Sequence, residues 1–145
     1  MKKLLYLTIL LLCFSTGCEE EVQGCIDNTA TNYNASATED DGSCLYTIIK
    51  TWQISNMFVD GQDVSSPGDY ITFYGDGSYL SDVDTGGIEI GVYTFSGNTL
   101  SMTSITVDGA PYSYSYTFTT TLFNGSNLTV AGDIKGNYIE IVMTS

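Results

Sequence analysis

The side chains that could do chemistry in this chain are carboxylates, hydroxyls and cysteines, because the sequence has no histidine. Without an imidazole, the Ser-His and Cys-His pairs that activate a nucleophile cannot form. The 17 acidic residues could supply a carboxylate pair for glycoside hydrolysis. However, Asp60, Asp76 and Asp108 each precede a glycine, and turn geometry with solvation explains such residues. No feature of the sequence selects a pair, so we expect a protein that is not an enzyme.

The first residues predict a secretory leader. Residues 1–3 carry positive charge, residues 4–14 are almost wholly apolar, and residues 15–17 are small. The apolar run is shorter than the roughly 20 residues that span a bilayer, so residues 1–17 are expected to be a signal peptide rather than a membrane helix. Cys18 follows directly.

The small residues before Cys18 resemble the lipobox of bacterial lipoproteins, although Ser15 stands where that family usually has an aliphatic residue. The resemblance implies cleavage before Cys18, a diacylglycerol on its thiol and a further acyl chain on its amine. Several acyl chains together hold a protein stably at a membrane. Ordinary leader cleavage, with Cys18 paired or free, is the alternative.

Residues 18–23 form an acidic tether that contains Glu19, Glu20 and Glu21. A run of charge is sufficiently explained as a solvated linker. Acidic residues directly after the lipidated cysteine also resemble the surface-export signal of Bacteroidetes lipoproteins. That resemblance implies an outer-membrane lipoprotein exposed at the cell surface, and attachment at the periplasmic face is the alternative.

Removing the leader leaves only Lys50 and Lys135 as cations against all 17 acidic residues, a formal charge of 2 − 17 = −15. Such a chain lacks the cations that hold phosphate backbones, so we expect no nucleic-acid partner. The absence of histidine also argues against soft transition-metal sites, whereas oxygen-preferring cations such as calcium stay open. Abundant Gly, Thr, Ser and Tyr favour strands and turns over helices.

Residues 24–46 form a distinct module that is rich in Asn, Asp, Thr and Ala. After export, Cys25 and Cys44 are the natural disulfide pair. Closing a loop of roughly 20 residues stabilises by about 3 kcal/mol in the chain-entropy model. Without the bridge, a segment this poor in core residues would be expected to stay disordered.

This module, here called the Cys-loop, resembles a repeat of surface and secreted proteins from marine Bacteroidetes. The resemblance rests on residues 24–27, 30–34, 37 and 40–46, and the repeat looks distantly like thrombospondin type 3 repeats, which bind calcium. It implies a calcium site whose oxygen ligands suit a hard cation: Asp27, Asn32, Asn34, Asp40 and Asp41. Alternatively, these residues form Asx-turns in a structural spacer.

Turn signals such as Asp60-Gly61, Asp76-Gly77 and Asp108-Gly109 recur through residues 47–145. The runs between them are rich in Ile, Val, Thr, Tyr and Phe, which is typical of antiparallel strands. The predicted strands are 47–58, 69–75, 78–84, 88–96, 99–107, 112–122, 127–132 and 137–144. These eight strands indicate an all-β barrel or sandwich. A change in the alternation near Ser104 predicts a bulge.

An aromatic stripe gives the clearest alternation. Tyr112, Tyr114, Tyr116 and Phe118 share one face of their strand, and hydroxyl side chains occupy the other. In a barrel, the apolar face points inward, so we expect the stripe to line a ligand cavity or to carry its hydroxyls to the rim. Trp52 is expected to plug the closed end of the barrel and to be part of the same ligand cavity.

The C-terminal domain resembles the small lipocalin-like lipoproteins of Bacteroidetes. The resemblance rests on residues 49–55 with their single tryptophan, and on 71–73 and 75–79, which form an Asp-Gly hairpin. Lys50 stands where true lipocalins have glycine. The resemblance implies a lipocalin-like, eight-stranded antiparallel barrel, with an immunoglobulin-like sandwich as the alternative.

Two functions follow from this reading. In the first, the anchored barrel binds a small, partly apolar ligand. In the second, the barrel has a filled core and acts as a structural or interaction module that contacts a partner protein or a surface glycan. Because eight-stranded barrels are either just filled or hold one ligand, the volume of the interior discriminates between the two.

Overall fold

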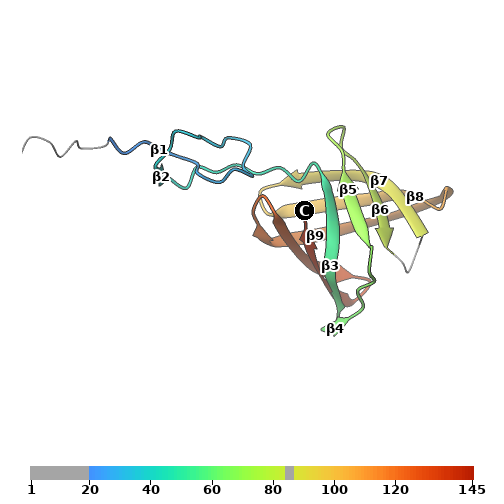
Figure 1. The fold of residues 1–145 in the computed structure, drawn as a ribbon. Coiled ribbons are helices and arrows are strands. Elements are labelled where there is room, and N and C mark those ends of the chain that lie inside the picture. The colour runs from blue at the N-terminus through green and yellow to red at the C-terminus, as the bar shows by residue number, and fades with distance from the viewer. Residues whose placement is uncertain (1–19, 84–86) are drawn as a thin grey trace, which may run out of the picture.

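The computed structural model describes residues 20–83 and 87–145, which form a small loop module followed by a β-barrel (Figure 1). In the Cys-loop, strands β1 (Gln23–Gly24) and β2 (Glu39–Asp40) pair in parallel. The predicted disulfide joins Cys25 to Cys44, with a Cα–Cα distance of 4.8 Å. No helix within the described ranges is long and apolar enough to cross a bilayer.

The barrel is a meander in which each long strand pairs antiparallel with the next along the chain. Its strands are β3 (Thr51–Val59), β5 (Tyr70–Phe73), β6 (Ser78–Val83), β7 (Gly87–Ser96), β8 (Thr99–Val107), β9 (Ala110–Phe123), β10 (Asn127–Ile134) and β11 (Asn137–Thr144). The two-residue β4 (Gln62–Asp63) pairs only with the end of β3. β11 pairs with β3 and closes the sheet. The fold is therefore the predicted lipocalin-like antiparallel barrel, and the sandwich alternative is wrong.

Two-residue turns connect several of these strands as the sequence predicts. At Asp60-Gly61, φ is 49° and 80°, and at Asp108-Gly109 it is 49° and 76°. Positive φ at both central positions is the geometry of a type I′ turn, which matches the twist of the flanking strands. The Asp60 carboxylate also accepts the backbone N–H of Tyr138 at 2.8 Å, which ties this turn to β11. Turn chemistry thus sets the register of neighbouring strands.

The closed end of the barrel is packed with large side chains, since Trp52, Phe73, Tyr79, Leu100 and Met143 are all at most 1% exposed. The predicted strand start at residue 47 is wrong by four residues, because β3 begins at Thr51. The chain before β3 instead turns Ile48 into the core, and the carbonyl of Ile48 accepts the indole N–H of Trp52 at 2.9 Å. This hydrogen bond satisfies the buried indole N–H within four residues of the chain, and the segment that supplies the carbonyl is not part of the strand.

The predicted bulge lies at Ile105, where the pairings of β8 with both neighbours shift. Ser104 is buried at 1% exposure, whereas Ile105 is 51% exposed. The bulge therefore reverses the inside-outside pattern of β8, and it keeps Val107 beside the interior at the open end.

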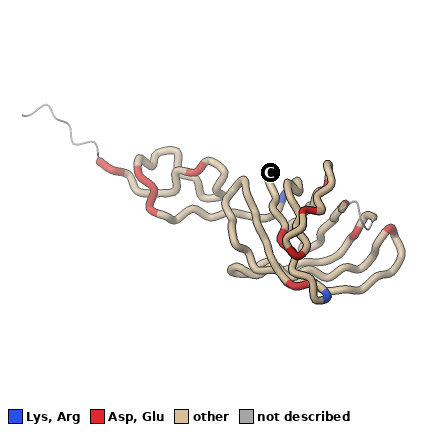
Figure 2. Tube along the Cα trace, turned by 90° about the horizontal axis from the view of Figure 1, so that it is seen from below, with Lys and Arg blue, Asp and Glu red and all other residues tan. Residues whose placement is uncertain are grey.

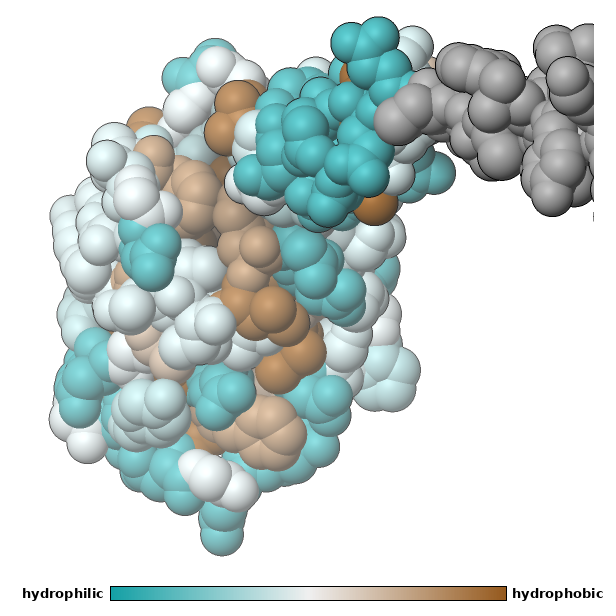
Figure 3. Space-filling view, turned by 90° about the vertical axis from the view of Figure 1, so that its left-hand side faces the viewer, coloured by the Kyte–Doolittle hydropathy of each residue, from teal (hydrophilic) through white to brown (hydrophobic). Residues whose placement is uncertain are grey.

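The Cys-loop is docked onto the closed end of the barrel. The ring of Tyr46 contacts Phe123 edge to face at 5.9 Å between centroids, and its hydroxyl donates to Asp27 at 2.7 Å. Thr29 packs so closely on Gly125 that a Cβ there would collide with it. The surface of the Cys-loop is mostly hydrophilic, while apolar atoms gather on the adjoining face of the barrel (Figure 3). Few core residues and one disulfide thus suffice for the loop, because the barrel supplies a packing surface.

Acidic residues are spread over both parts of the molecule (Figure 2). The two lysines of the described residues are engaged at opposite ends of the barrel. Lys50 donates to the carbonyl of Gly125 at 2.6 Å, and Lys135 lies 4.6 Å from the ring centroid of Tyr114. Both cations are therefore held outside the barrel interior.

Candidate functional site

A cavity of about 450 Å³ occupies the barrel interior on the open side of the packed end. Its walls come from all eight barrel strands, because the alternation of each strand supplies inward-facing side chains. Most of the lining is apolar: Met57, Ile71, Val83, Leu100, Met102, Val107, Phe118, Val130, Ile134, Ile139, Ile141 and Met143. The polar side chains among the lining residues are Ser81, Glu89, Tyr112 and Tyr116.

The aromatic stripe is divided between this cavity and the rim. Tyr112, Tyr116 and Phe118 line the cavity, with Phe118 4% exposed and Tyr112 39% exposed near the mouth. Tyr114 does not line it and lies under Lys135 instead. Trp52 does not line it either, because it is buried in the packed end against Phe123 at 6.3 Å. The structure thus brings together three of the five residues that the sequence assigned to a ligand cavity.

Glu89 places a carboxylate in this mostly apolar wall. One carboxylate oxygen accepts the hydroxyl of Tyr79, and the other accepts the hydroxyl of Tyr116 at 3.2 Å. Burial raises the pKa of both tyrosines, and the neighbouring Glu89 raises their pKa further. Both hydroxyls therefore keep their protons at neutral pH and act as donors. Two donors thus hold the carboxylate of Glu89 in place inside the cavity.

The sequence did not indicate Glu89, because its neighbours are misleading. Ile88 and Ile90 are 44% and 46% exposed, so the apolar residues of this part of β7 point outward. The inward phase is set instead by Tyr93, which packs on Phe73 at 4.8 Å, and counting back by twos from Tyr93 reaches Glu89. The alternation from Tyr93 therefore predicts that Glu89 points inward, whereas the apolar Ile88 and Ile90 suggest the opposite phase.

Gly91 makes room for the tyrosine that holds Glu89. A Cβ at Gly91 would lie 2.6 Å from Cε1 of Tyr79, and closer still to the carbonyl oxygen of Thr103. The ring of Tyr79 therefore lies directly on the backbone of β7, fully buried, with its hydroxyl aimed along the strand at Glu89. A glycine two positions from the carboxylate is thus part of the construction of the site.

A second hollow of about 350 Å³ adjoins the mouth of the cavity, lined by residues of the β3–β4 hairpin and by Val83. Met57 and Val83 line both spaces. The entrance of the barrel is therefore widened on the side of β4, where β3 and β5 pair over only three residues of each strand.

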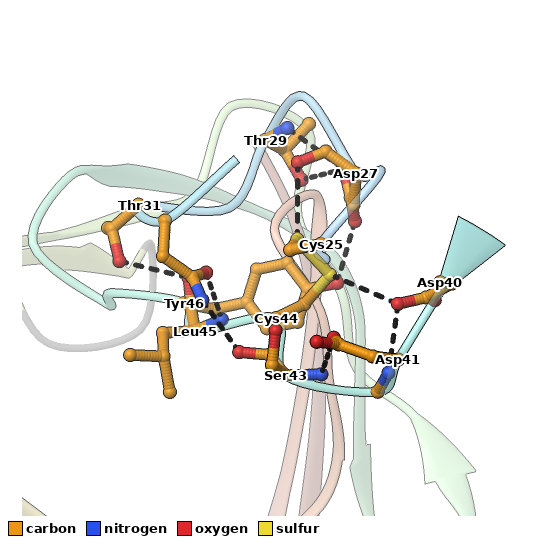
Figure 4. The surroundings of a disulfide bond; sticks show 12 residues. Cys25, Asp27, Thr29, Thr31, Asp40, Asp41, Ser43, Cys44, Leu45 and Tyr46 are labelled. Atoms are coloured by element: carbon orange, nitrogen blue, oxygen red, sulfur yellow. Dashed lines mark hydrogen bonds between the residues drawn. A yellow bond between two sulfur atoms is a disulfide. The ribbon is translucent and has the colours of Figure 1, made fainter. Parts of the chain in front are cut away.

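The five predicted calcium ligands are spread along the Cys-loop, and Figure 4 shows Asp27, Asp40 and Asp41 among them. Each accepts a backbone N–H: Asp27 from Thr29, Asn32 from Leu45, Asn34 from Ser36, Asp40 from Gly42 and Asp41 from Ser43. Within the described residues, no group of three or more His, Cys, Asp or Glu side chains converges in a way that could hold a metal ion. Asx-turns explain four of these side chains without an ion, and Asn32 instead accepts the N–H of Leu45 across the loop. Calcium binding stays the alternative to this structural role.

Hydrogen bonds from Tyr46 and Thr29 lower the pKa of the Asp27 carboxyl below its usual value, with Tyr46 the larger cause. Asp27 thereby has a second role, because the same carboxylate joins the turn to the ring that packs on the barrel. The predicted lipidation site Cys18, with Glu19, lies outside the described residues.

No protein-family model matches the chain. No curated protein matches it either. Among solved structures, it is similar to an uncharacterized protein from Bacteroides eggerthii, with 14% identity and a TM-score of 0.50, over 68% of this chain and 99% of that one. It is also similar to a lipocalin-like protein from Bacteroides uniformis, with 18% identity and a TM-score of 0.49, over 68% of this chain and 97% of that one. At such identities the likeness concerns the fold alone.

Proposed function

We propose that the protein is a lipid-anchored outer-membrane protein whose barrel binds a small, partly apolar ligand. The observation that carries the proposal is the cavity of about 450 Å³ with apolar walls and a few polar groups. Small-molecule sites typically have about 300–1,000 Å³ and this mixture of lining residues. A barrel with a filled core would leave no interior space of this size.

The anchor is proposed from the leader and from Cys18 with the small residues before it. In this arrangement the acidic tether and the Cys-loop act as a spacer between the lipid and the barrel. Because the Cys-loop packs through Tyr46 and Thr29 on the closed end, the open end with the cavity mouth is turned away from the tether. Ligand could then enter without obstruction by the anchoring segment.

Ligand binding is tested with the neutral dye Nile red and a pair of tryptophan variants. Ile134→Trp would fill part of the cavity, whereas Leu122→Trp adds the same side chain to an outward position that is 49% exposed. We expect fluorescence enhancement with the wild type and Leu122→Trp, and a loss of at least tenfold in affinity with Ile134→Trp. Absence of binding to the wild type, or equal binding to all three, would contradict the proposal.

Anchoring is tested separately in cells grown on labelled palmitate. The wild type is expected to incorporate label and Cys18→Ala is not, because the thiol is the proposed acylation site. Protease added to intact cells is expected to digest a surface-exposed protein. Equal labelling of both forms would refute the anchor, and full protection from protease would refute surface exposure.

A second candidate function is contact with a partner protein. Ile88, Ile90, Val92 and Ile105 are 44–51% exposed, and they adjoin one another on the outer faces of β7 and β8. Contiguous apolar patches on a soluble surface often mark interaction sites. Replacing Ile90 by Lys would weaken such a contact while leaving the cavity intact, which separates this function from ligand binding.

A further inference from the structure

Among the described residues that line the cavity, Glu89 is the only one with a formal charge. The hydroxyls of Tyr79 and Tyr116 each occupy one of its oxygens. A carboxylate has about four lone-pair sites, so two donors leave acceptor capacity on both oxygens. Glu89 can therefore accept further donors from a molecule in the cavity.

Neither lysine of the described chain lines the cavity with this carboxylate. Lys50 is held at the closed end by Gly125 and Ser145, and Lys135 lies over the ring of Tyr114, which does not line the cavity. A charge in apolar surroundings is costly unless it is paired and hydrogen-bonded. The tyrosines supply hydrogen bonds, but no residue that lines the cavity supplies a positive charge.

We propose that the ligand of this cavity is an amphiphile with a positively charged nitrogen, whose cation pairs with Glu89 while its apolar part lies along the aliphatic walls. The proposal rests on the proposed function, since it names the class of ligand for the same site. An anionic amphiphile such as a fatty acid would place a second negative charge beside Glu89. The formal charge of 2 − 17 = −15 on residues 18–145 adds to that repulsion.

Three decyl compounds that differ only in their head groups test the charge selectivity: decylammonium, decanol and decanoate. Isothermal titration calorimetry with the wild type is expected to give the tightest binding for decylammonium, about ten- to a hundredfold tighter than for decanol, because the ammonium can pair its charge with the Glu89 carboxylate whereas the neutral hydroxyl of decanol can only donate a hydrogen bond. Decanoate is expected to bind more weakly than decanol.

Two variants with the same change in net charge separate a local pair from general attraction. Glu89→Gln removes the cavity carboxylate, whereas Glu140→Gln removes an outward one, since Glu140 lies between the buried, inward-facing Ile139 and Ile141. Glu89→Gln is expected to keep the circular dichroism spectrum of the wild type, which shows that it is folded, and to bind decylammonium no more tightly than decanol. Glu140→Gln is expected to keep that preference.

The outcomes distinguish this inference from the proposed function. Binding of all three compounds with similar affinity would leave the binding function standing and overturn the charge selectivity. An equal loss of preference in Glu89→Gln and Glu140→Gln would also overturn it, because net charge alone would then be the cause. If none of the compounds binds the wild type, the proposed function and this inference both fail.

Discussion

Replacing Gly91 by alanine is expected to destabilise the barrel by about 2 kcal/mol. The new Cβ would lie 2.6 Å from Cε1 of Tyr79, whereas ordinary contacts begin at 3.4 Å, and the carbonyl of Thr103 would be nearer still. Overpacking of a core costs about 1–3 kcal/mol, and a weakened ladder hydrogen bond adds about 1 kcal/mol. Reduced freedom of the unfolded chain offsets about 0.4–1 kcal/mol of this.

Urea denaturation followed by the fluorescence of Trp52 measures the effect, since this single, fully buried tryptophan reports unfolding directly. With a slope of about 2 kcal/mol per molar urea, the midpoint should fall by about 1 M. Gly75→Ala is the matched control, because its Cβ would meet only Ile49 Cδ1, at 4.0 Å. That variant should stay within about 0.5 kcal/mol of the wild type or be slightly more stable. Equal stability of Gly91→Ala and Gly75→Ala would refute the close packing of Tyr79 on β7.

Three further predictions concern the Cys-loop. Cys44→Ser removes the bridge to Cys25, and with it about 3 kcal/mol of stabilisation from the closed loop. Chymotrypsin should then cut faster at the exposed Tyr33 while the barrel stays intact, and unchanged cleavage would contradict this. The pKa of Asp27 is lowered in the folded protein, so its ionised carboxylate stabilises the fold above the ordinary Asp pKa, and this stabilisation is lost as the pH falls through the pKa of the folded state. Because the Tyr46 hydroxyl is the largest cause, Tyr46→Phe should raise the pKa of Asp27, which NMR titration of the carboxyl measures. An unchanged pKa would be the contrary result. Because the turn carboxylates are already hydrogen-bonded, calorimetry with calcium should show no saturable site, and a site that Asp41→Asn abolishes would instead establish calcium as a ligand.

The sequence was sufficient for the strands and turns because both depend on local signals. Residues 137–144 alternate cleanly between faces, and the observed β11 has the same bounds. The bulge at Ile105 was predictable for the same reason, since a reversal of alternation has no other simple explanation in a barrel. The start of β3 was predicted too early because the strand propensity of residues 47–50 does not show that the Ile48 carbonyl accepts the indole N–H of Trp52 instead of pairing with a neighbouring strand.

The candidate site was less predictable because it depends on contacts between distant residues. The alternation of the aromatic stripe predicted that Tyr116 and Phe118 line the cavity. The sequence contains no signal that the hydroxyls of Tyr116 and Tyr79 donate to the two oxygens of the Glu89 carboxylate. Docking of the Cys-loop likewise depends on Tyr46 meeting Phe123 across 77 positions, and no local pattern records such a pair.

Closure of the barrel by β3 and β11 has a consequence for how the chain folds. Gln53, near the start of the domain, pairs with Thr144, near its end, so the ring cannot form until nearly the whole domain is present. Until then, the meander is an open sheet with two unpaired edges, which can associate with edges of other chains. The final pairing joins segments of large sequence separation, a topology that slows folding. We therefore expect truncation within β11 to leave the hairpins intact but produce an aggregating chain rather than a smaller barrel.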